Sequence, residues 1–129
     1  MHKDYAKALR ALKRFTPVRF SDEKLHNKLS SDGGVYVVSH DVNGVSEVIY
    51  VGKAKSLRGR LYQNLVNGQL RSHTLSRKCL VLHRLRSKAG VKRFLLEQCS
   101  VRWVIVPDKK DRSFLEHFLI AHFRCALND

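Results

Sequence analysis

Residues 34–52 read GVYVVSHDVNGVSEVIYVG, and they are the most informative part of the chain. Valine, isoleucine and tyrosine, which favour strands, fill most of both halves. Between the halves stands Asn43-Gly44, the dipeptide that most strongly indicates a tight hairpin turn. The segment therefore predicts two antiparallel strands, with Tyr36 on the first and Tyr50 on the second.

The length of the hairpin loop determines whether the two tyrosines share a face of the sheet. A two-residue loop places Tyr36 opposite Val51, and the tyrosines then lie on opposite faces. A three-residue loop that begins at Val42 places Tyr36 opposite Tyr50, and both hydroxyls then project from one face. We expect the three-residue loop. The alternative for the tyrosines themselves is that they are ordinary strand residues, because aromatic side chains are common in strands.

The tripeptides at the two ends of this hairpin form a family motif. Gly-Val-Tyr at residues 34–36 and Tyr-Val-Gly at 50–52 resemble the signature of the GIY-YIG nuclease family. The run from residue 50 to 61 is similar to the DNA excision-repair incision subunits of that family. This resemblance extends over residues 33–128, so that almost the whole chain matches a nuclease module.

A short helix is expected directly after the hairpin. Leucines at residues 57, 61 and 65 recur every four residues, which predicts one apolar face of a helix over 56–66. Arg60 lies off that face. The resemblance carries the catalytic arginine of the family to Arg60 rather than to Arg58, and the lysine of the incision subunits to Lys53.

A second informative helix is expected from Asp111 to Phe123. Its apolar residues cover nearly its full circumference, which is typical of a buried helix. Glu116 within it must be ion-paired, protonated or bound to a cation. A structural ion pair is the alternative to a metal ligand. The resemblance places the metal-binding glutamate of the family at Glu116 and a supporting asparagine at Asn128.

The resemblance implies hydrolysis of phosphodiester bonds in DNA with one metal ion per site. Glu116 is expected to bind Mg²⁺ or Mn²⁺, and Arg60 to bind the scissile phosphate. A tyrosine is expected to take a proton from the attacking water, and its pKa of about 10 would have to be lowered by cationic neighbours. Lys53 and Arg60 are the candidates for that role. The expected catalytic residues are Tyr36, Tyr50, Lys53, Arg60 and Glu116, with structural support from Gly34, Gly52 and Asn128.

One position departs from the family pattern. Many members carry histidine or tyrosine four residues after the catalytic arginine, where this chain has Asn64. An auxiliary role of this position in proton transfer is therefore in doubt, and His73 is the candidate substitute. A zinc site is a weaker alternative. Cys79 and His83 have a suitable helical spacing, but four ligands are not supplied.

Charge is the second strong signal in the sequence. The net charge is +14 and the isoelectric point about 10.2, as expected of a nucleic-acid-binding domain. No Asp or Glu occurs between Val48 and Leu96. We expect duplex, branched or damaged DNA as the partner, because so uniform a charge repels itself without a polyanion. The residues expected to bind the nucleic acid are Lys53, Lys55, Arg58, Arg71, Arg77, Lys78, Arg84, Arg86 and Lys88.

The rest of the chain predicts a single α+β domain over residues 1–129. We expect a small three-stranded antiparallel sheet with flanking helices, in which 33–128 form the nuclease core and 1–30 an N-terminal helical extension. Further elements are expected as helices over 3–14, 74–88 and 91–98, a helix capped by Ser21, and a strand over 100–106.

Location and partners follow from composition. No apolar run approaches the roughly 20 residues that span a bilayer, and the N-terminus lacks the apolar core of a signal peptide. Three cysteines without a Cys-x-x-Cys pair are typical of reduced thiols in an intracellular, cytoplasmic protein. A second copy of the chain or a partner protein is a candidate source of substrate specificity.

A DNA- or RNA-binding module without catalytic activity is the rival interpretation. Such a module would have the same basic surface. The joint presence of Tyr36, Tyr50, Arg60 and Glu116 argues against it, because binding alone does not need a carboxylate beside a phosphate.

Overall fold

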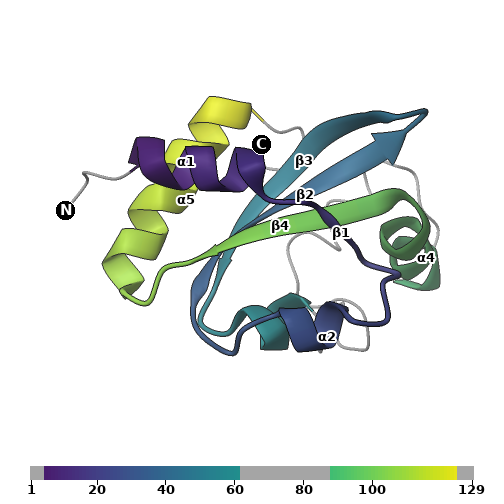
Figure 1. Cartoon of the computed structure of the whole chain (residues 1–129), viewed down its shortest axis with the longest axis horizontal. Helices are drawn as coiled ribbons and strands as arrows, with labels where there is room; N and C mark the ends of the chain where they lie inside the picture. The colour runs from purple at the N-terminus through teal and green to yellow at the C-terminus, as the bar shows by residue number, and fades with distance from the viewer. Residues whose placement is uncertain (1–4, 62–87, 125–129) are drawn as a thin grey trace.

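The structure is a computed structural model that describes residues 5–61 and 88–124. One antiparallel sheet has helices on both of its faces (Figure 1). The strands lie in the order β1-β4-β2-β3, so that β1 and β3 are the outer strands. The elements in chain order are α1 (Tyr5–Arg14), β1 (Val18–Arg19), α2 (Leu25–Lys28), β2 (Gly34–Val42), β3 (Val45–Ala54), α4 (Lys88–Gln98), β4 (Cys99–Ile105) and α5 (Lys109–Phe123).

The sheet has four strands, and the expectation of three was wrong. The additional strand is β1, in which Val18 pairs with Val101 and Arg19 with Ser100. A strand of two residues directly after Pro17 is too short to show an alternating pattern. Its pairing depends on β4, which lies some eighty residues later in the sequence, and tertiary contact therefore creates it.

The helix expected after Ser21 also differs from the prediction. Helix α2 begins only at Leu25 and has no side-chain cap. Asp22 instead accepts a hydrogen bond from the backbone N–H of Lys24 at 2.8 Å. A side chain that bonds the backbone two residues later stabilises a turn, and this turn delays the start of the helix.

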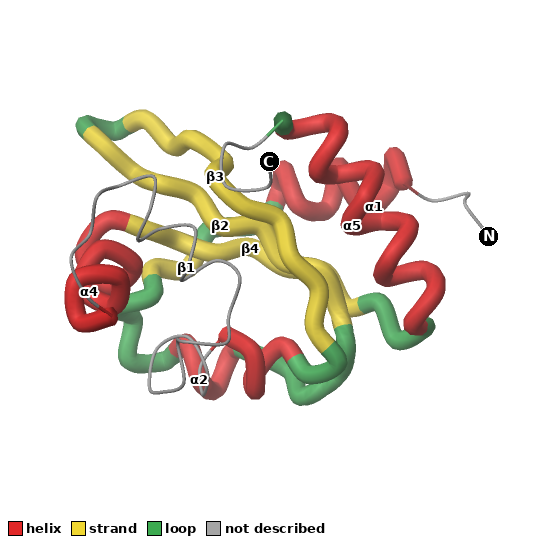
Figure 2. Tube along the Cα trace, turned by 180° about the vertical axis from the view of Figure 1, so that it is seen from behind, coloured by secondary structure: helices red, strands yellow, loops and turns green. Residues whose placement is uncertain are grey.

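Two separate apolar cores fill the spaces above and below the sheet. One lies between the sheet and α2, α4 and the helical residues 57–61, and the other between the sheet and α1 and α5. Figure 2 shows the two groups of helices on opposite sides of the strands. Tyr36 and Val38 face the first core, whereas Val35 and Val37 face the second, as the alternation of a strand requires.

The β2–β3 hairpin closes with a two-residue loop, so the expectation of a three-residue loop was wrong. Val42 pairs with Val45, and Asn43 and Gly44 both have positive φ, at 52° and 79°. Positive φ at both central positions is the geometry of a type I′ turn, which asparagine followed by glycine favours.

A β-bulge within the hairpin restores the shared face that the loop alone would have removed. Ser39 pairs with Val48 but Val38 pairs with Tyr50, which leaves Ile49 as an extra residue in β3. Beyond the bulge the register is shifted by one residue. Ile49 and Tyr50 both face the core that contains Tyr36. The two tyrosines therefore share a face, as expected, for a different physical reason.

The C-terminal helix α5 is buried on one side only. Asp108 caps it by accepting the backbone N–H of Asp111 at 2.9 Å. Leu115 and Leu119 are buried, whereas 54% of the Phe114 surface is exposed. The prediction of a helix buried on all sides was wrong because α5 packs one side against the sheet and, among the described helices, lies beside α1 alone.

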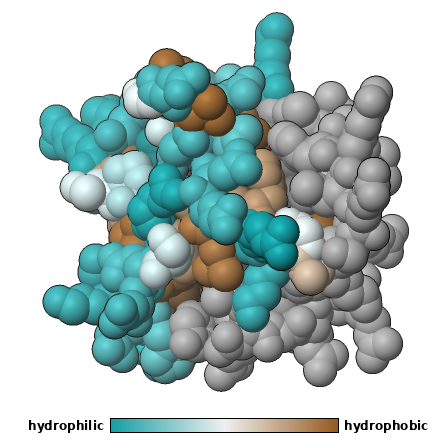
Figure 3. Space-filling model, turned by 90° about the vertical axis from the view of Figure 1, so that its right-hand side faces the viewer, coloured by the Kyte–Doolittle hydropathy of each residue, from teal (hydrophilic) through white to brown (hydrophobic). Residues whose placement is uncertain are grey.

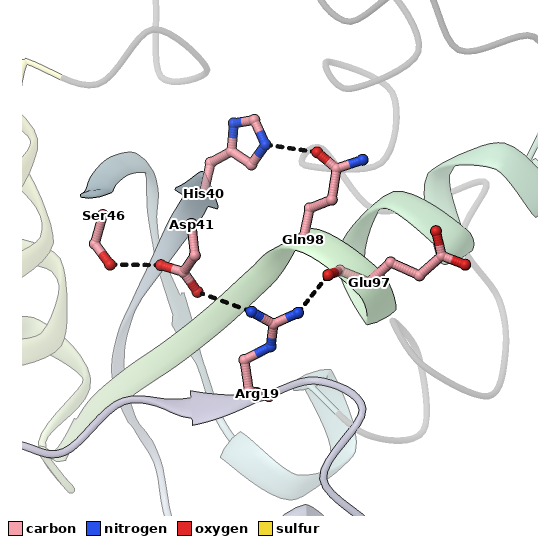
Figure 4. Close-up of polar contacts among 6 residues, drawn as sticks. All are labelled: Arg19, His40, Asp41, Ser46, Glu97 and Gln98. Atoms are coloured by element: carbon pink, nitrogen blue, oxygen red, sulfur yellow. Dashed lines mark hydrogen bonds and ion pairs between the residues drawn. The ribbon is translucent and has the colours of Figure 1, made fainter. Parts of the chain in front are cut away.

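Polar contacts join the tip of the hairpin to β1 and to the end of α4 (Figure 4). Arg19 Nη1 lies 3.6 Å from Asp41 Oδ2, and the Arg19 guanidinium also donates to the Glu97 carbonyl. His40 Nε2 lies 2.8 Å from Gln98 Oε1. These contacts fix the distal half of the hairpin, while the half that carries the tyrosines lies on the other side of the bulge.

The described surface is mostly hydrophilic on the face drawn in Figure 3, where apolar side chains occur in small areas between polar ones. In the described part of the chain, no helix combines the length and the apolar character needed to cross a membrane.

Candidate active site

Tyr36 and Tyr50 lie beside each other on one face of the sheet. Their ring centroids are 6.2 Å apart, with an angle of 40° between the planes. Tyr36 is almost completely buried, and 8% of the Tyr50 surface is exposed to solvent. The register explains the contact, because Tyr36 of β2 pairs with Gly52 of β3, and Tyr50 lies two residues before Gly52 on β3.

Gly52 leaves the space that the ring of Tyr36 occupies. A Cβ atom at residue 52 would lie 2.4 Å from Tyr36 Oη and 2.9 Å from Tyr50 Cε2. The Tyr36 hydroxyl thus lies over β3, the outer strand. Gly34 has an equivalent role beneath residue 57, since a Cβ there would lie 2.8 Å from Leu57 Cδ1 and 2.4 Å from the Val104 carbonyl oxygen. These contacts give a steric reason for both glycines.

The two arginines of the helical residues 57–61 have different environments. Arg58 donates from Nε to the carbonyls of His26 and Leu29 at 3.2 and 3.1 Å, and from Nη2 to Leu29 at 2.8 Å. It thereby joins this helix to the end of α2. Arg60 is partly exposed and influences the pKa of both tyrosines. Arg60 is therefore the arginine whose charge acts on the tyrosine pair.

Lys53 and Glu116 meet between β3 and α5. Lys53 Nζ donates to Ser113 Oγ at 2.7 Å and lies 4.0 Å from Glu116 Oε1. The side chain of Lys53 is 45% exposed and that of Glu116 only 16%. Burial raises the pKa of the Glu116 carboxyl, while the charges of Lys53 and His117 oppose that rise.

Electrostatics connect the two groups into one site. Burial raises the pKa of Tyr36 well above its ordinary value, Tyr50 and Glu116 raise it further, and Arg60 lowers it. Burial and Glu116 together raise the pKa of Tyr50 to about 12, again opposed by Arg60. Tyr36, Tyr50, Arg60 and Glu116 are therefore within electrostatic reach of one another, although Glu116 belongs to the layer on the opposite side of the sheet.

The tyrosines do not have the lowered pKa values that a general base was expected to need. Arg60 acts in the expected direction, but burial and Glu116 outweigh it. Lys53 acts on the Glu116 carboxyl rather than on the tyrosines. Without a bound cation, both tyrosines are therefore neutral hydrogen-bond donors near neutral pH.

The chemistry of Glu116 fits a hard divalent cation. It offers carboxylate oxygens at a mostly buried position, and Mg²⁺ binds through one or two carboxylates while keeping several waters. Among residues 5–61 and 88–124, no three His, Cys, Asp or Glu side chains come together as a metal cluster. A single carboxylate with water ligands suits Mg²⁺ or Mn²⁺ and does not suit zinc.

Several residues predicted from the sequence lie outside the described residues. They are Asn64, Arg71, His73, Arg77, Lys78, Cys79, His83, Arg84, Arg86 and Asn128, and the side chain of Lys88 belongs with them. Of the remaining residues predicted to bind nucleic acid, Lys53 and Lys55 are exposed; Lys53 lies in β3 and Lys55 directly follows its last residue.

Ser113 is the site residue that sequence reasoning missed. It stands three residues before Glu116 on α5, a spacing that places two side chains on one helix face. That spacing could have identified it as a neighbour of the metal ligand. Its bond to Lys53 depends on how β3 and α5 are placed, which the sequence pattern does not show.

A cavity of about 580 Å³ lies elsewhere, beside β1. Aromatic and charged side chains line it, among them Phe15, Arg19 and Trp103. It belongs to the opposite edge of the sheet from β3, and none of the expected site residues lines it.

Comparisons with solved structures show a similarity of fold. Neither the protein-family models nor the curated proteins give a match. The search of solved structures finds crystal structures of the GIY-YIG N-terminal endonuclease domain of UvrC from Thermotoga maritima. One, bound to its catalytic cation magnesium, is 25% identical and has a TM-score of 0.51, with 84% of this chain and 99% of that chain covered.

Two further structures of the same domain are point mutants bound to the catalytic divalent cation. They are 24% and 23% identical, both with a TM-score of 0.51, and cover 84% of this chain and 99% and 98% of theirs. At this identity they show the fold. This similarity, together with the paired tripeptides on β2 and β3, shows that the chain has the fold of a GIY-YIG endonuclease domain.

Proposed function

We propose that this chain is a divalent-metal-dependent DNA endonuclease. The observation that supports it most is geometric: the rings of Tyr36 and Tyr50 lie 6.2 Å apart on one face of the sheet, and Lys53 of the same hairpin lies 4.0 Å from Glu116 of α5. The β2–β3 hairpin and helix α5, which are distant from each other in the sequence, thus contribute to one proposed site. The proposal covers residues 33–128 as the nuclease core, with the N-terminal residues as an extension that packs on it.

Each side chain has a role that its surroundings support. Arg60, partly exposed, binds the scissile phosphate through its planar guanidinium and stabilises the charge that develops in the transition state. The two tyrosines hold and orient the attacking water by hydrogen bonds. Lys53, whose side chain is 45% exposed, attracts the substrate backbone by its positive charge.

Glu116 would hold the cation. When bound, a divalent ion supplies Lewis-acid stabilisation of phosphate charge. The negative charge of Glu116 raises the pKa of both tyrosines, so any group that compensates this charge makes it easier for a tyrosine to release its proton. This is a physical route by which a tyrosine with a high pKa can act as the base.

DNA is the proposed substrate because of charge. The chain carries 25 Lys and Arg against 11 Asp and Glu, and such a surplus attracts a polyphosphate. A DNA substrate implies a location inside the cell. The choice among duplex, branched and damaged DNA is proposed to depend on the basic segment before α4, on a second copy of the chain, or on a partner protein.

A plasmid nicking assay with Mg²⁺ or Mn²⁺ tests the proposal, and Glu116→Gln is the informative variant. We expect it to lose cleavage and keep DNA binding, because it removes the cation ligand and a negative charge near the phosphate. Glu47→Gln, on the exposed part of β3, is the matched control and should cleave normally. DNA binding without cleavage by the unmodified chain would instead favour the non-catalytic binding module.

A further inference from the structure

The ammonium of Lys53 has two possible partners on one face of α5. Ser113 and Glu116 are three residues apart, and Lys53 reaches both from the neighbouring strand β3. It donates a hydrogen bond to the Ser113 hydroxyl at 2.7 Å, and its distance to Glu116 Oε1 is 4.0 Å. The neutral hydroxyl therefore holds the closer contact and the charged carboxylate the more distant one.

This order is opposite to what charge alone favours. A direct ammonium–carboxylate hydrogen bond has a length of about 2.7–2.9 Å and is roughly twice as strong as a neutral one. The Glu116 side chain is mostly buried, so a direct bond there would be less screened than on the open surface. The geometry of α5 and β3 thus holds the Lys53 ammonium beside Ser113, which lies about one helical turn before Glu116 on α5.

The arrangement matters for a cation at Glu116. An ammonium bonded directly to the carboxylate would occupy the lone pairs that a divalent ion needs, and the ion would have to displace it. At 4.0 Å the Lys53 charge still attracts the carboxylate, but it leaves the oxygens open. Ser113 supplies the alternative bond that makes this separation stable.

We propose that Ser113 is a positioning residue that holds Lys53 away from Glu116 and thereby keeps the carboxylate available to a divalent cation. This inference rests on the proposed function, since it takes Glu116 as the cation ligand. Loss of the Ser113 hydroxyl frees Lys53 to bond with Glu116, where it competes with the cation.

Isothermal titration of the metal-free full chain with Mn²⁺, without DNA, tests this proposal. Ser113→Ala is expected to weaken Mn²⁺ binding about five-fold, in line with the loss of one hydrogen bond. Ser113→Thr keeps a hydroxyl and should restore most of the affinity. Ser46→Ala is the matched control, since Ser46 donates to Asp41 at 2.5 Å in the hairpin, away from Lys53. Thermal unfolding of every variant verifies that it is folded.

The decisive comparison removes the ammonium. In a Lys53→Met background, Ser113→Ala should have no effect on Mn²⁺ affinity, because the competing group is absent. An equal loss in both backgrounds would mean that Ser113 acts through the shape of α5, and would overturn the proposal. So would a Ser113→Ala variant that binds Mn²⁺ like the unmodified chain.

Glu116→Gln separates failure of this inference from failure of the proposed function. If the unmodified chain and Glu116→Gln bind Mn²⁺ equally, Glu116 is not the ligand, and the proposed function and this inference both fail. If Glu116→Gln loses Mn²⁺ binding while Ser113→Ala and Ser113→Thr both bind Mn²⁺ like the unmodified chain, only the role of Ser113 is rejected.

Discussion

Arg58 and Arg60 are two residues apart and show how neighbouring identical side chains acquire different roles. Arg58 uses its guanidinium to bond backbone carbonyls at the end of α2, whereas the charge of Arg60 lowers the pKa of both tyrosines. From the sequence, Arg58 was interpreted as a nucleic-acid contact. A buried bond to a carbonyl leaves no signal in the pattern, because the partners His26 and Leu29 lie in a separate segment.

Substitution of these two arginines should separate catalysis from stability. Arg60→Ala is expected to reduce turnover by roughly 10²–10³ or more, as removal of one transition-state donor does, with little change in the free energy of unfolding. Arg58→Ala is expected to lower the free energy of unfolding by about 1–3 kcal/mol, because it leaves carbonyls without their donor. Single-turnover cleavage and urea unfolding measure the two effects. Equal, mild losses of turnover in both variants would contradict the assignment of Arg60.

The Glu116 carboxyl provides a test by pH. Burial raises its pKa and the charge of Lys53 lowers it, so Lys53→Met should raise the pKa further. A raised pKa means that the protonated form persists to higher pH, and Mn²⁺ binding should therefore be lost at a higher pH as acid is added. Carbon NMR titration of the carboxyl in the metal-free chain measures the shift. Lys55→Met, two residues along, is the control, and an equal shift in that variant would contradict a local effect of Lys53.

At the scale of elements, the hairpin shows what a sequence pattern predicts and what it does not. Strand composition and Asn43-Gly44 correctly predict two antiparallel strands and their turn. The shared face of Tyr36 and Tyr50 was also expected. The bulge at Ile49 that produces it was not, because an extra residue in a strand of valines and isoleucines changes no local preference.

Gly52 should be required by the site rather than by its backbone conformation. A Cβ at this position would lie 2.4 Å from Tyr36 Oη, so Gly52→Ala must displace the ring. We expect a loss of about 1–3 kcal/mol in the free energy of unfolding, together with a strong loss of cleavage. Urea unfolding and the nicking assay measure both.

Gly44→Ala is the matched control for Gly52→Ala. Its φ of 79° makes alanine unfavourable, but a Cβ there meets no atom within 4 Å. It should therefore lose stability and keep cleavage. If both variants lose cleavage in proportion to stability, the steric role of Gly52 is rejected.

At the scale of the whole molecule, α1 and β1 belong to the fold although the sequence marks them only as an extension. Leu12 of α1 is fully buried in the core with α5, and β1 completes one edge of the sheet. Arg102 of β4 donates to the Leu12 carbonyl at 3.1 Å, which fixes the end of α1. The packing of α1 follows from long-range contacts, which no sequence motif predicts.

The basic charge of the molecule predicts a strong salt dependence of DNA binding. The logarithm of the binding constant should fall with the logarithm of salt by about 0.9 per phosphate neutralised on duplex DNA. Replacement of Arg84, Arg86 and Lys88 by serine should reduce this slope and weaken binding alike on unrelated sequences. Fluorescence anisotropy at several salt concentrations measures both.

A matched triple variant distinguishes local contacts from total charge. Lys7, Arg10 and Lys13 are exposed on α1, and their replacement by serine changes the net charge equally. If Arg84, Arg86 and Lys88 contact the phosphates, the α1 variant should change the salt-dependence slope much less than their replacement does. Equal changes would mean that binding depends only on the overall charge.

The bulge at Ile49 also gives the hairpin a practical use. The segment between Ser39 and Val48 is separated from the tyrosines by this irregularity, and its tip at Asn43 and Gly44 is exposed. Arg19 contacts Asp41 of this segment, and Gln98 contacts His40. A fluorophore attached at Asn43 would therefore lie on the exposed turn, separated by the bulge from the tyrosines. From there it could report the approach of DNA while cleavage proceeds unchanged.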